Sequence, residues 1–570
     1  MIVLIVYLFA AVYDIMQLMR QNNRTRGLPL FNFSFKDKAA RRVLLTIIKF
    51  VFAVALTVLA YLTAKEPAYL WVGLIELALI FVIYNLLVDT KIVFRFLADL
   101  LFFIYVAQML VLYFGNSFIT LTMLKNVQFL QDLGGRAVAY ILGTVIVLAI
   151  VFMPGQNILH KINKKILLAP VILLLIVEIV LHGSYKRFSP VQSFGTIFAS
   201  EIRYQKVKRA SVNPEIARES YYRPSFEDGI AKPKSLPENP NVIVIFTEGL
   251  SSNIISDERE IMPNLAAFED ECLTFENYYN HTFPTLRGVQ GQLYSGYKLD
   301  DNEVANNLIS VQGILKNQGY TTSFINVEPI NDIFIEYCNN LGFNNVITDI
   351  THCTGEAKGM TDGEAYRLLM DSAYDLSESD KPFFLSVYTF GTHVSFDTPD
   401  SEVVYDDGSN EVLNRFYYLD KEFGEFLEEF KASDLADNTI LIFTTDHATY
   451  ADQTYMKAFP NYKRECTDVD TIPFFIYYKG MDHKTVDAGG KNSLCFAPTV
   501  LDYLDINSEN YFLGTSLFDS KASSEFDSIF YDASYMVSTE GGQVRYLDDL
   551  EVDDFLSQVL SYYTAVETIE

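Results

Sequence analysis

The chain carries two different patterns of hydrophobic residues. Up to residue 182, long apolar stretches are separated by short polar loops, whereas after residue 240 short apolar runs alternate with segments of helical spacing. A helix needs about 20 mostly apolar residues to cross a bilayer core. Six stretches qualify, near residues 2–19, 43–63, 68–88, 92–114, 137–153 and 166–181. The pattern predicts a transmembrane domain of about six helices over residues 1–182.

Charged residues interrupt some of these stretches. The first stretch contains Asp14 and the fourth contains Arg95 and Asp99, which we expect to face other helices rather than lipid. The first stretch has no basic segment before it and no small-residue cleavage pattern, so we interpret it as a helix and not a signal peptide. Residues 117–133 have helical spacing and few charges, which fits either a helix at the outer membrane interface or an ordinary loop helix.

The C-terminal pattern predicts an α/β domain. Unbroken apolar runs such as NVIVIF (241–246) and TILIFTT (439–445) are typical of strands buried on both faces. TTSFINV, KPFFLSVYTF and TIPFFIYY are further strand candidates, and helical spacing appears in MPNLAAFEDE, SVQGILKNQ, GEAYRLLMDSAYDL and LDKEFGEFLEEFKAS. Strands alternating with helices predict an α/β domain over residues 241–570, with a mixed, largely parallel sheet flanked by helices. The polar segment 183–240 ends in KPKSLPENPN, which indicates a juxtamembrane linker.

Charge separates the two parts further. The 570-residue chain has a net charge of −27, but residues 1–182 hold 16 Lys and Arg against 8 Asp and Glu, and the remainder holds 28 against 63. Such an acidic body would repel nucleic acid phosphates, so we expect no nucleic acid partner. All five cysteines lie in the acidic body without a CxxC pair, which gives no support to a zinc finger or a thioredoxin-like site.

Loop charge predicts the orientation. The loop after the first stretch, residues 20–42, holds seven Lys and Arg against one Asp, and residues 161–165 hold three Lys and no acid. Basic loops stay on the cytoplasmic side. Because an even number of helices separates these loops, the sixth helix runs outward. We expect a multi-pass protein of the cell membrane with an extracytoplasmic acidic body.

Candidate metal ligands follow the two clearest strands. Glu248 follows the first run, and Asp446 and His447 follow the second. The carboxyl ends of strands are where ligands bind in open α/β sheets, so these side chains can converge on one cation. Carboxylates with one imidazole suit Mn²⁺ or Zn²⁺, and Mg²⁺ less well. The alternatives are a helix N-terminal acid at Glu248 and a polar strand exit at Asp446 and His447.

Two further segments carry residues that could act on a phosphate. In YNHTFPTLRGVQGQLYSG (279–296), Thr285 could attack a phosphorus centre beside a cation while Arg287 binds phosphate oxygens. The alternative is a helix cap at Thr285 and a surface role for Arg287. His393, in YTFGTHVSF, could act as a general acid or orient a phosphate, or it could be an ordinary loop histidine.

Taken in order, these segments resemble the lipoteichoic-acid-synthase-like phosphoglycerol transferase branch of the sulfatase/alkaline-phosphatase superfamily. The resemblance covers roughly residues 240–520. It rests on NVIVIFTEGLS, MPNLAAFEDECLTFENYY, TFPTLRG, LGFNNVI, GMTDGEAY, KPFFLSVYTFGTHVSF, NTILIFTTDHA and APTVLDYLDINSENYFLGTSLF. Where that branch often has Gly after the Asp-His pair, this chain has Ala448.

The resemblance implies a mechanism. One divalent cation, usually Mn²⁺, would be held by Glu248, Thr285, Asp446 and His447, with His393 contacting the substrate. Thr285 would attack phosphatidylglycerol, forming a phospho-threonine intermediate and releasing diacylglycerol. The glycerol phosphate would pass to an envelope glycan, a glycolipid or a glycerol-phosphate polymer. Thr282 is the other possible nucleophile, but Thr285 directly precedes the Leu-Arg-Gly run.

Other functions fit less well. A phosphoethanolamine transferase would use the same fold and threonine, but such enzymes usually have a cysteine-rich nucleophile loop, and no cysteine lies between Cys272 and Cys338. A true sulfatase needs Cys or Ser where this chain has Thr. A non-catalytic membrane-anchored binding protein remains the alternative outside enzymes, and the full set of expected metal ligands argues against it.

Overall fold

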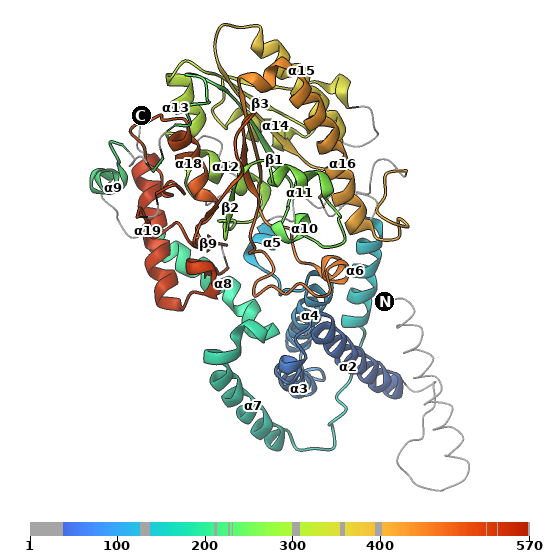
Figure 1. The fold of residues 1–570 in the computed structure, drawn as a ribbon. Helices are drawn as coiled ribbons and strands as arrows, with labels where there is room; N and C mark the ends of the chain where they lie inside the picture. The colour runs from blue at the N-terminus through green and yellow to red at the C-terminus, as the bar shows by residue number, and fades with distance from the viewer. Residues whose placement is uncertain are drawn as a thin grey trace. The chain divides into compact units, whose positions relative to one another are not determined.

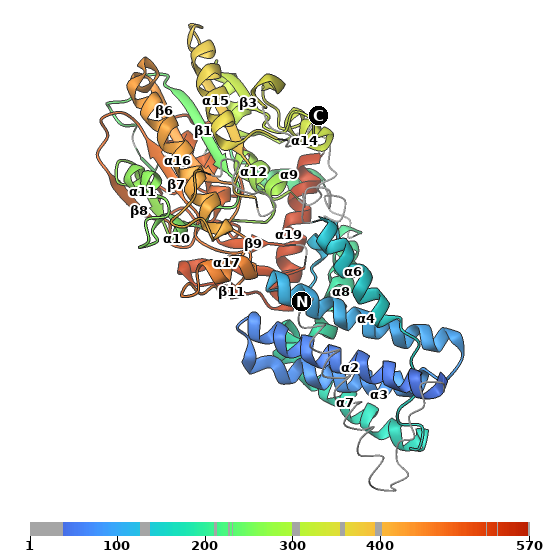
Figure 2. The same cartoon turned by 90° about the vertical axis from the view of Figure 1, so that its right-hand side faces the viewer.

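The computed structural model describes residues 38–125, 137–209, 214–225, 229–230, 232–298, 308–353, 359–393, 402–519, 521–532 and 534–567. The chain divides into two compact units, residues 1–199 and 200–570. Figure 1 and Figure 2 show their elements. The predicted stretch 2–19, with Asp14, lies outside the described residues.

The first unit is built from apolar helices. Its helices are α2 (Lys38–Thr63), α3 (Leu70–Leu87), α4 (Ile92–Gly115), the short α5 (Leu121–Lys125), α6 (Ala137–Val151) and α7 (Lys164–Tyr185). In the described part, four helical segments are long and apolar enough to cross a membrane: Lys38–Thr63, Pro67–Leu87, Ile92–Gly115 and Lys164–Phe188. The predicted stretch 137–153 forms α6, whose apolar part is shorter. Residues 117–133 were expected to form either an interface helix or a loop helix, and the described part of this segment contains α5 (Leu121–Lys125).

Helices α2, α3 and α4 pack side by side around one apolar cluster (Figure 2). Asp99 of α4 is buried there and accepts a hydrogen bond from Lys49 Nζ of α2 at 2.8 Å. Arg95 Nε lies 3.9 Å from Asp99, with its side chain one-third exposed. The expectation that Asp99 faces other helices is confirmed, because an ion pair with Lys49 offsets the cost of its burial.

The second unit is an α/β domain on one eight-stranded sheet. The strands are β1 (Asn241–Thr247), β2 (Leu273–Glu276), β3 (Thr321–Ile325), β4 (Asn345–Ile347), β5 (Phe383–Thr389), β6 (Thr439–Thr445), β7 (Phe474–Tyr477) and β8 (Lys484–Asp487). Their order is β4-β3-β5-β1-β6-β7-β2-β8. The first five strands in this order, from β4 to β6, run parallel, and β7 pairs antiparallel with both β6 and β2. This confirms the predicted fold class.

Helices cover both faces of the sheet. One set consists of α11 (Pro263–Glu269), α15 (Asp362–Ser377) and α16 (Glu411–Ala432), and the other of α12 (Thr285–Tyr294), α13 (Val311–Asn317) and α18 (Phe496–Tyr503) (Figure 1). Because of this double cover, every residue of β1, β5 and β6 is buried. The helices α10 (Ser252–Ile255), α14 (Asp332–Asn339) and α17 (Gln453–Ala458) lie in the connections.

The chain ends in a small antiparallel sheet and a helix. The sheet contains β9 (Ile529–Tyr531), β10 (Met536–Ser538) and β11 (Arg545–Tyr546), and α19 (Asp549–Glu567) follows. The segment predicted as a linker, 183–240, contains α8 (Pro190–Lys208) and α9 (Pro214–Tyr221). Helix α9 packs on α19, so part of this segment is joined to the α/β body.

Candidate active site

Strands β1 and β6 end at the same edge of the sheet. Thr247 and Thr445, their last residues, are partners in the parallel ladder. The main chain continues this pairing, since Asp446 N donates to the Thr247 carbonyl at 3.1 Å. The polar residues after both strands are therefore neighbours, as the two apolar runs in the sequence suggested.

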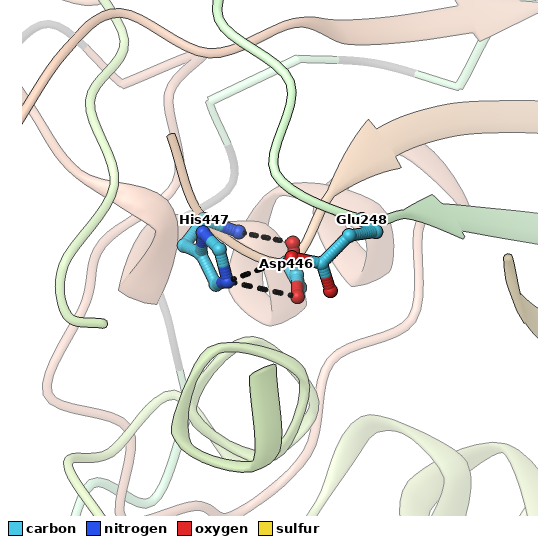
Figure 3. Close-up of side chains that lie close together, drawn as sticks. All are labelled: Glu248, Asp446 and His447. Atoms are coloured by element: carbon cyan, nitrogen blue, oxygen red, sulfur yellow. Dashed lines mark hydrogen bonds and ion pairs between the residues drawn. The ribbon is translucent and has the colours of Figure 1, made fainter. Parts of the chain in front are cut away.

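Glu248, Asp446 and His447 form a buried cluster at this edge. Figure 3 shows the three side chains close together, Glu248 from the end of β1 and the other two from the end of β6. His447 Nε2 lies 3.5 Å from Glu248 Oε1 and 3.3 Å from Asp446 Oδ2. One ligand atom from each residue lies within 4.8 Å of the others, a spacing that one metal ion can bridge.

The surrounding hydrogen bonds orient these side chains. Asp446 Oδ1 accepts from the main-chain N–H groups of Gly249 at 2.8 Å and His447 at 2.7 Å. His447 Nδ1 lies 2.8 Å from the Ala448 carbonyl oxygen, so Nδ1 carries the proton and Nε2 is left as a ligand atom. Within the described residues, no hydrogen-bond donor reaches the buried Asp446 Oδ2.

The donor set fits a divalent cation. Two carboxylate oxygens and one imidazole nitrogen face one another, and one of those oxygens is buried without a donor. A buried polar atom of this kind is costly unless a ligand satisfies it. Oxygen and nitrogen ligands together suit Mn²⁺ or Zn²⁺.

Burial and neighbouring charges shift the pKa values of the cluster. Burial raises the pKa of Asp446 to about 7 despite the favourable charge of His447. Burial also opposes ionisation of Glu248, but the charges of His447 and His393 and the hydrogen bonds from Tyr388 and Thr285 outweigh it and lower the Glu248 pKa. Burial raises the pKa of Tyr388 well above 10, so its phenol stays protonated near neutral pH.

Thr285 lies beside this cluster. It is the first residue of α12, and its Oγ donates to Glu248 Oε2 at 3.0 Å. The side chain of Thr285 is half-buried, which leaves room for an approaching group. The hydroxyl of Thr282, by contrast, is buried and donates to the Tyr531 carbonyl of β9 at 2.9 Å. Of the two threonines in the predicted nucleophile segment, the structure brings Thr285 to the carboxylates.

A comparison with protein families matches this part of the chain. The family described as Sulfatase matches residues 240–506, from the residue before β1 to just beyond α18, including the whole cluster. Residues 240–506 are a sulfatase-family domain.

Similar proteins agree with this assignment. Lipoteichoic acid synthase 2 of Bacillus subtilis is 25% identical over 309 residues, which cover 49% of this chain and 47% of the relative. The chain thus spans about half the length of that relative.

Two solved structures share the fold. An alkaline phosphatase superfamily protein from Vibrio parahaemolyticus has a TM-score of 0.50 at 18% identity, covering 62% of this chain and 95% of its own. The lipooligosaccharide phosphoethanolamine transferase A (EptA) of Neisseria meningitidis, an integral membrane protein, has a TM-score of 0.51 at 14% identity, covering 85% and 97%. At these identities the likeness concerns the fold.

The other two predicted site residues, His393 and Arg287, lie outside the cluster of Glu248, Asp446 and His447. His393 follows β5, the centre of its ring lies 4.8 Å from that of Phe390, and its charge helps to lower the pKa of Glu248. Arg287 lies in the first turn of α12 with its side chain fully buried, so it does not lie on an open surface. A phosphate-binding role for Arg287 stays a prediction.

Sequence reasoning missed Tyr388. This residue of β5 donates a hydrogen bond to Glu248 Oε2, and its hydroxyl lies 3.4 Å from Thr285 Oγ. The available signal was a tyrosine near the carboxyl end of the predicted strand KPFFLSVYTF.

Sequence reasoning also missed Arg464. The buried Arg464 guanidinium donates to Ser251 Oγ at 2.8 Å and to the Thr449 carbonyl, and it lies 2.8 Å from Asp470 Oδ2. It thereby ties the loop after β1 to the loop after β6. No motif marked this residue.

Proposed function

We propose that the protein is a membrane-anchored, metal-dependent phosphoglycerol transferase that moves glycerol phosphate from phosphatidylglycerol to an acceptor of the cell envelope. The observation that carries the proposal is the position of Thr285 Oγ, 3.0 Å from Glu248 Oε2 at the edge of the Glu248, Asp446 and His447 cluster. A hydroxyl nucleophile beside a candidate cation site is the arrangement that phosphoryl transfer through a covalent intermediate needs. The name of the relative, lipoteichoic acid synthase 2, supports a product related to lipoteichoic acid.

Glu248, Asp446, His447 and Thr285 would hold the cation. When bound, it lowers the pKa of the threonine hydroxyl and neutralises charge on the transferring phosphoryl group. We favour Mn²⁺, with Zn²⁺ or Mg²⁺ as the other candidates.

The residues of the chain account for the first half of the reaction. Thr285 Oγ attacks the phosphorus of phosphatidylglycerol, and its proton passes toward Glu248 Oε2, to which the hydroxyl already donates. The bond from phosphorus to the diacylglycerol oxygen breaks, and we propose that His393 gives that oxygen a proton. The glycerol phosphate is then esterified to Thr285.

In the second half, the steps reverse with a different alcohol. A hydroxyl of an envelope glycan, a glycolipid or a growing glycerol-phosphate chain attacks the phosphorus. The bond to Thr285 Oγ breaks, and the threonine hydroxyl is restored. Arg287 is the residue of α12 that we propose for holding phosphate oxygens during transfer.

The location follows from the helices and the charges. We propose a multi-pass anchor, with the sulfatase domain on the extracytoplasmic side, as the basic loops 20–42 and 161–165 indicate. The domain would then meet phospholipid headgroups of the outer leaflet.

Diacylglycerol release tests the proposal. The full chain would be reconstituted with Mn²⁺ into vesicles of phosphatidylcholine containing either phosphatidylglycerol or phosphatidylethanolamine. We expect diacylglycerol from the phosphatidylglycerol vesicles, and none from a Thr285→Ala variant. Release only from phosphatidylethanolamine would instead make the protein a phosphoethanolamine transferase. Release from neither, with Mn²⁺ bound, would contradict a phospholipid donor.

A further inference from the structure

Tyr388 is held rigidly beside the proposed nucleophile. It lies in β5, between β3 and β1, where it is the ladder partner of Phe246. Its ring is 1% exposed and packs 5.7 Å from the ring of Phe334 and 6.1 Å from that of Phe390. Because packing fixes the ring, the position of the hydroxyl is determined by the sheet.

The Tyr388 hydroxyl reaches two oxygens that the proposed reaction uses. It donates to Glu248 Oε2, and it lies 3.4 Å from Thr285 Oγ. Glu248 Oε2 therefore accepts hydrogen bonds from both hydroxyls, while Oε1 faces His447 Nε2 at 3.5 Å. Because both donors bind Oε2, the other carboxylate oxygen, Oε1, is the one turned toward His447.

A second consequence concerns the nucleophile. Thr285 Oγ is held against Glu248 by its own proton, and attack on phosphorus removes that proton. Once that proton has passed to Glu248 Oε2, the hydrogen bond that Thr285 Oγ donates to the carboxylate is lost. Within hydrogen-bond reach of both oxygens, Tyr388 still has a proton to donate.

We propose that Tyr388 is a positioning residue of the transfer reaction, whose hydroxyl orients Glu248 toward the cation and holds Thr285 Oγ in place as it loses its proton. The inference rests on the proposed function, in which Thr285 is the nucleophile. The competing explanation is that the ring only fills the core, in which case a phenylalanine would serve equally well.

The test is Tyr388→Phe in the full chain, which removes one oxygen and keeps every ring contact. Loss of a residue that orients a metal ligand typically costs about 10- to 100-fold in metal affinity or activity. We expect losses of that size in Mn²⁺ affinity, measured by calorimetry, and in kcat for diacylglycerol release. KM for the phospholipid should stay within about twofold, since Tyr388 contacts the carboxylate and the nucleophile and not the lipid chains.

Tyr478→Phe is the matched control. Tyr478 is also buried, and its hydroxyl donates to the Asp437 carbonyl at 3.0 Å. Asp437 precedes β6, so this hydrogen bond lies at the opposite edge of the sheet from Asp446. We expect wild-type kcat and Mn²⁺ affinity in this variant.

Wild-type kcat and Mn²⁺ affinity in Tyr388→Phe would overturn the inference, as would losses no larger than those of Tyr478→Phe. Should the phenylalanine variant fail to fold, Tyr388→Met, which also lacks a hydroxyl, carries the same expectation. If the wild-type chain releases no diacylglycerol from any phospholipid, the proposed function fails. The Mn²⁺ affinities then still decide the role of Tyr388, since weaker binding in the variant supports it and equal binding overturns it.

Discussion

Gly288 lies against the main chain of Asp446, so close that a Cβ atom on residue 288 would fall 2.2 Å from the Asp446 carbonyl oxygen. This contact lets the first turn of α12 approach the end of β6. We expect Gly288→Ala to push α12 away from the cluster, because the obstacle is backbone and cannot rotate aside. Overpacking of this kind costs about 1–3 kcal/mol. The temperature of thermal unfolding and the rate of diacylglycerol release should both be lower than in the wild type.

Gly195→Ala in α8 is the control for that substitution, since no described atom lies within 4 Å of the added Cβ. Alanine is favoured over glycine in helices by about 0.5–1 kcal/mol, so this variant should unfold at the wild-type temperature or slightly above it. Gly288→Ala with wild-type stability and activity would contradict the proposed close packing.

Removal of the cation should abolish transfer. Chelation is expected to stop diacylglycerol release, and added Mn²⁺ to restore it. Asp446→Asn should lower Mn²⁺ affinity by at least tenfold, because the buried Oδ2 position loses its charge. Asp487→Asn, at a carboxylate that accepts from Asn277 and Gly489 on the surface, should bind like wild type. Equal Mn²⁺ affinity in both variants, measured by calorimetry, would contradict the metal site.

Arg464 should matter for stability more than an exposed basic residue does. Arg464→Met leaves Asp470 buried without its cation, which typically costs about 3–5 kcal/mol. Lys431→Met breaks a more exposed pair with Glu271, worth about 0–1 kcal/mol. We expect thermal unfolding of the first variant at a clearly lower temperature. Similar unfolding temperatures for the two variants would show that Arg464 does not join the loops as described.

Asp362 should make stability depend on pH. It is fully buried at the start of α15, where Oδ1 accepts from Gly391 N at 2.9 Å, and burial raises its pKa to about 7. The unfolded chain loses this proton near pH 4, so the carboxyl reduces the free energy of unfolding progressively as the pH rises from about 4 to about 7.

Asp362→Asn keeps the acceptor for Gly391 and removes the charge. It should therefore stabilise the protein more at pH 8 than at pH 5, measured by thermal unfolding in parallel with wild type. The same effect at both pH values would show that the Asp362 carboxyl is not held protonated by the fold.

Much of the fold was predictable because it depends on local pattern. The apolar runs 241–246 and 439–445 form β1 and β6, and the helical segments around MPNLAAFEDE and LDKEFGEFLEEFKAS form α11 and α16. Glu248, Asp446 and His447 were predictable for the same reason, since each directly follows an unbroken apolar strand.

The supporting residues were not predictable in this way. Tyr388 acts on Glu248 because β5 lies beside β1, although β2, β3 and β4 separate the two strands in the sequence. Gly288 and Arg464 matter through backbone and loops that only the tertiary fold brings together. The spacing of residues along the sequence does not predict such contacts.

Mass spectrometry of the peptide around Thr285 tests the central claim most directly. The full chain would be incubated with Mn²⁺ and phosphatidylglycerol without acceptor, quenched and digested, and residues 279–298 examined. We predict a glycerophosphate adduct on Thr285, absent from Thr285→Ala and from chelated samples. An unmodified Thr285 in metal-loaded protein that still releases diacylglycerol, or an adduct on Thr282, would contradict the account.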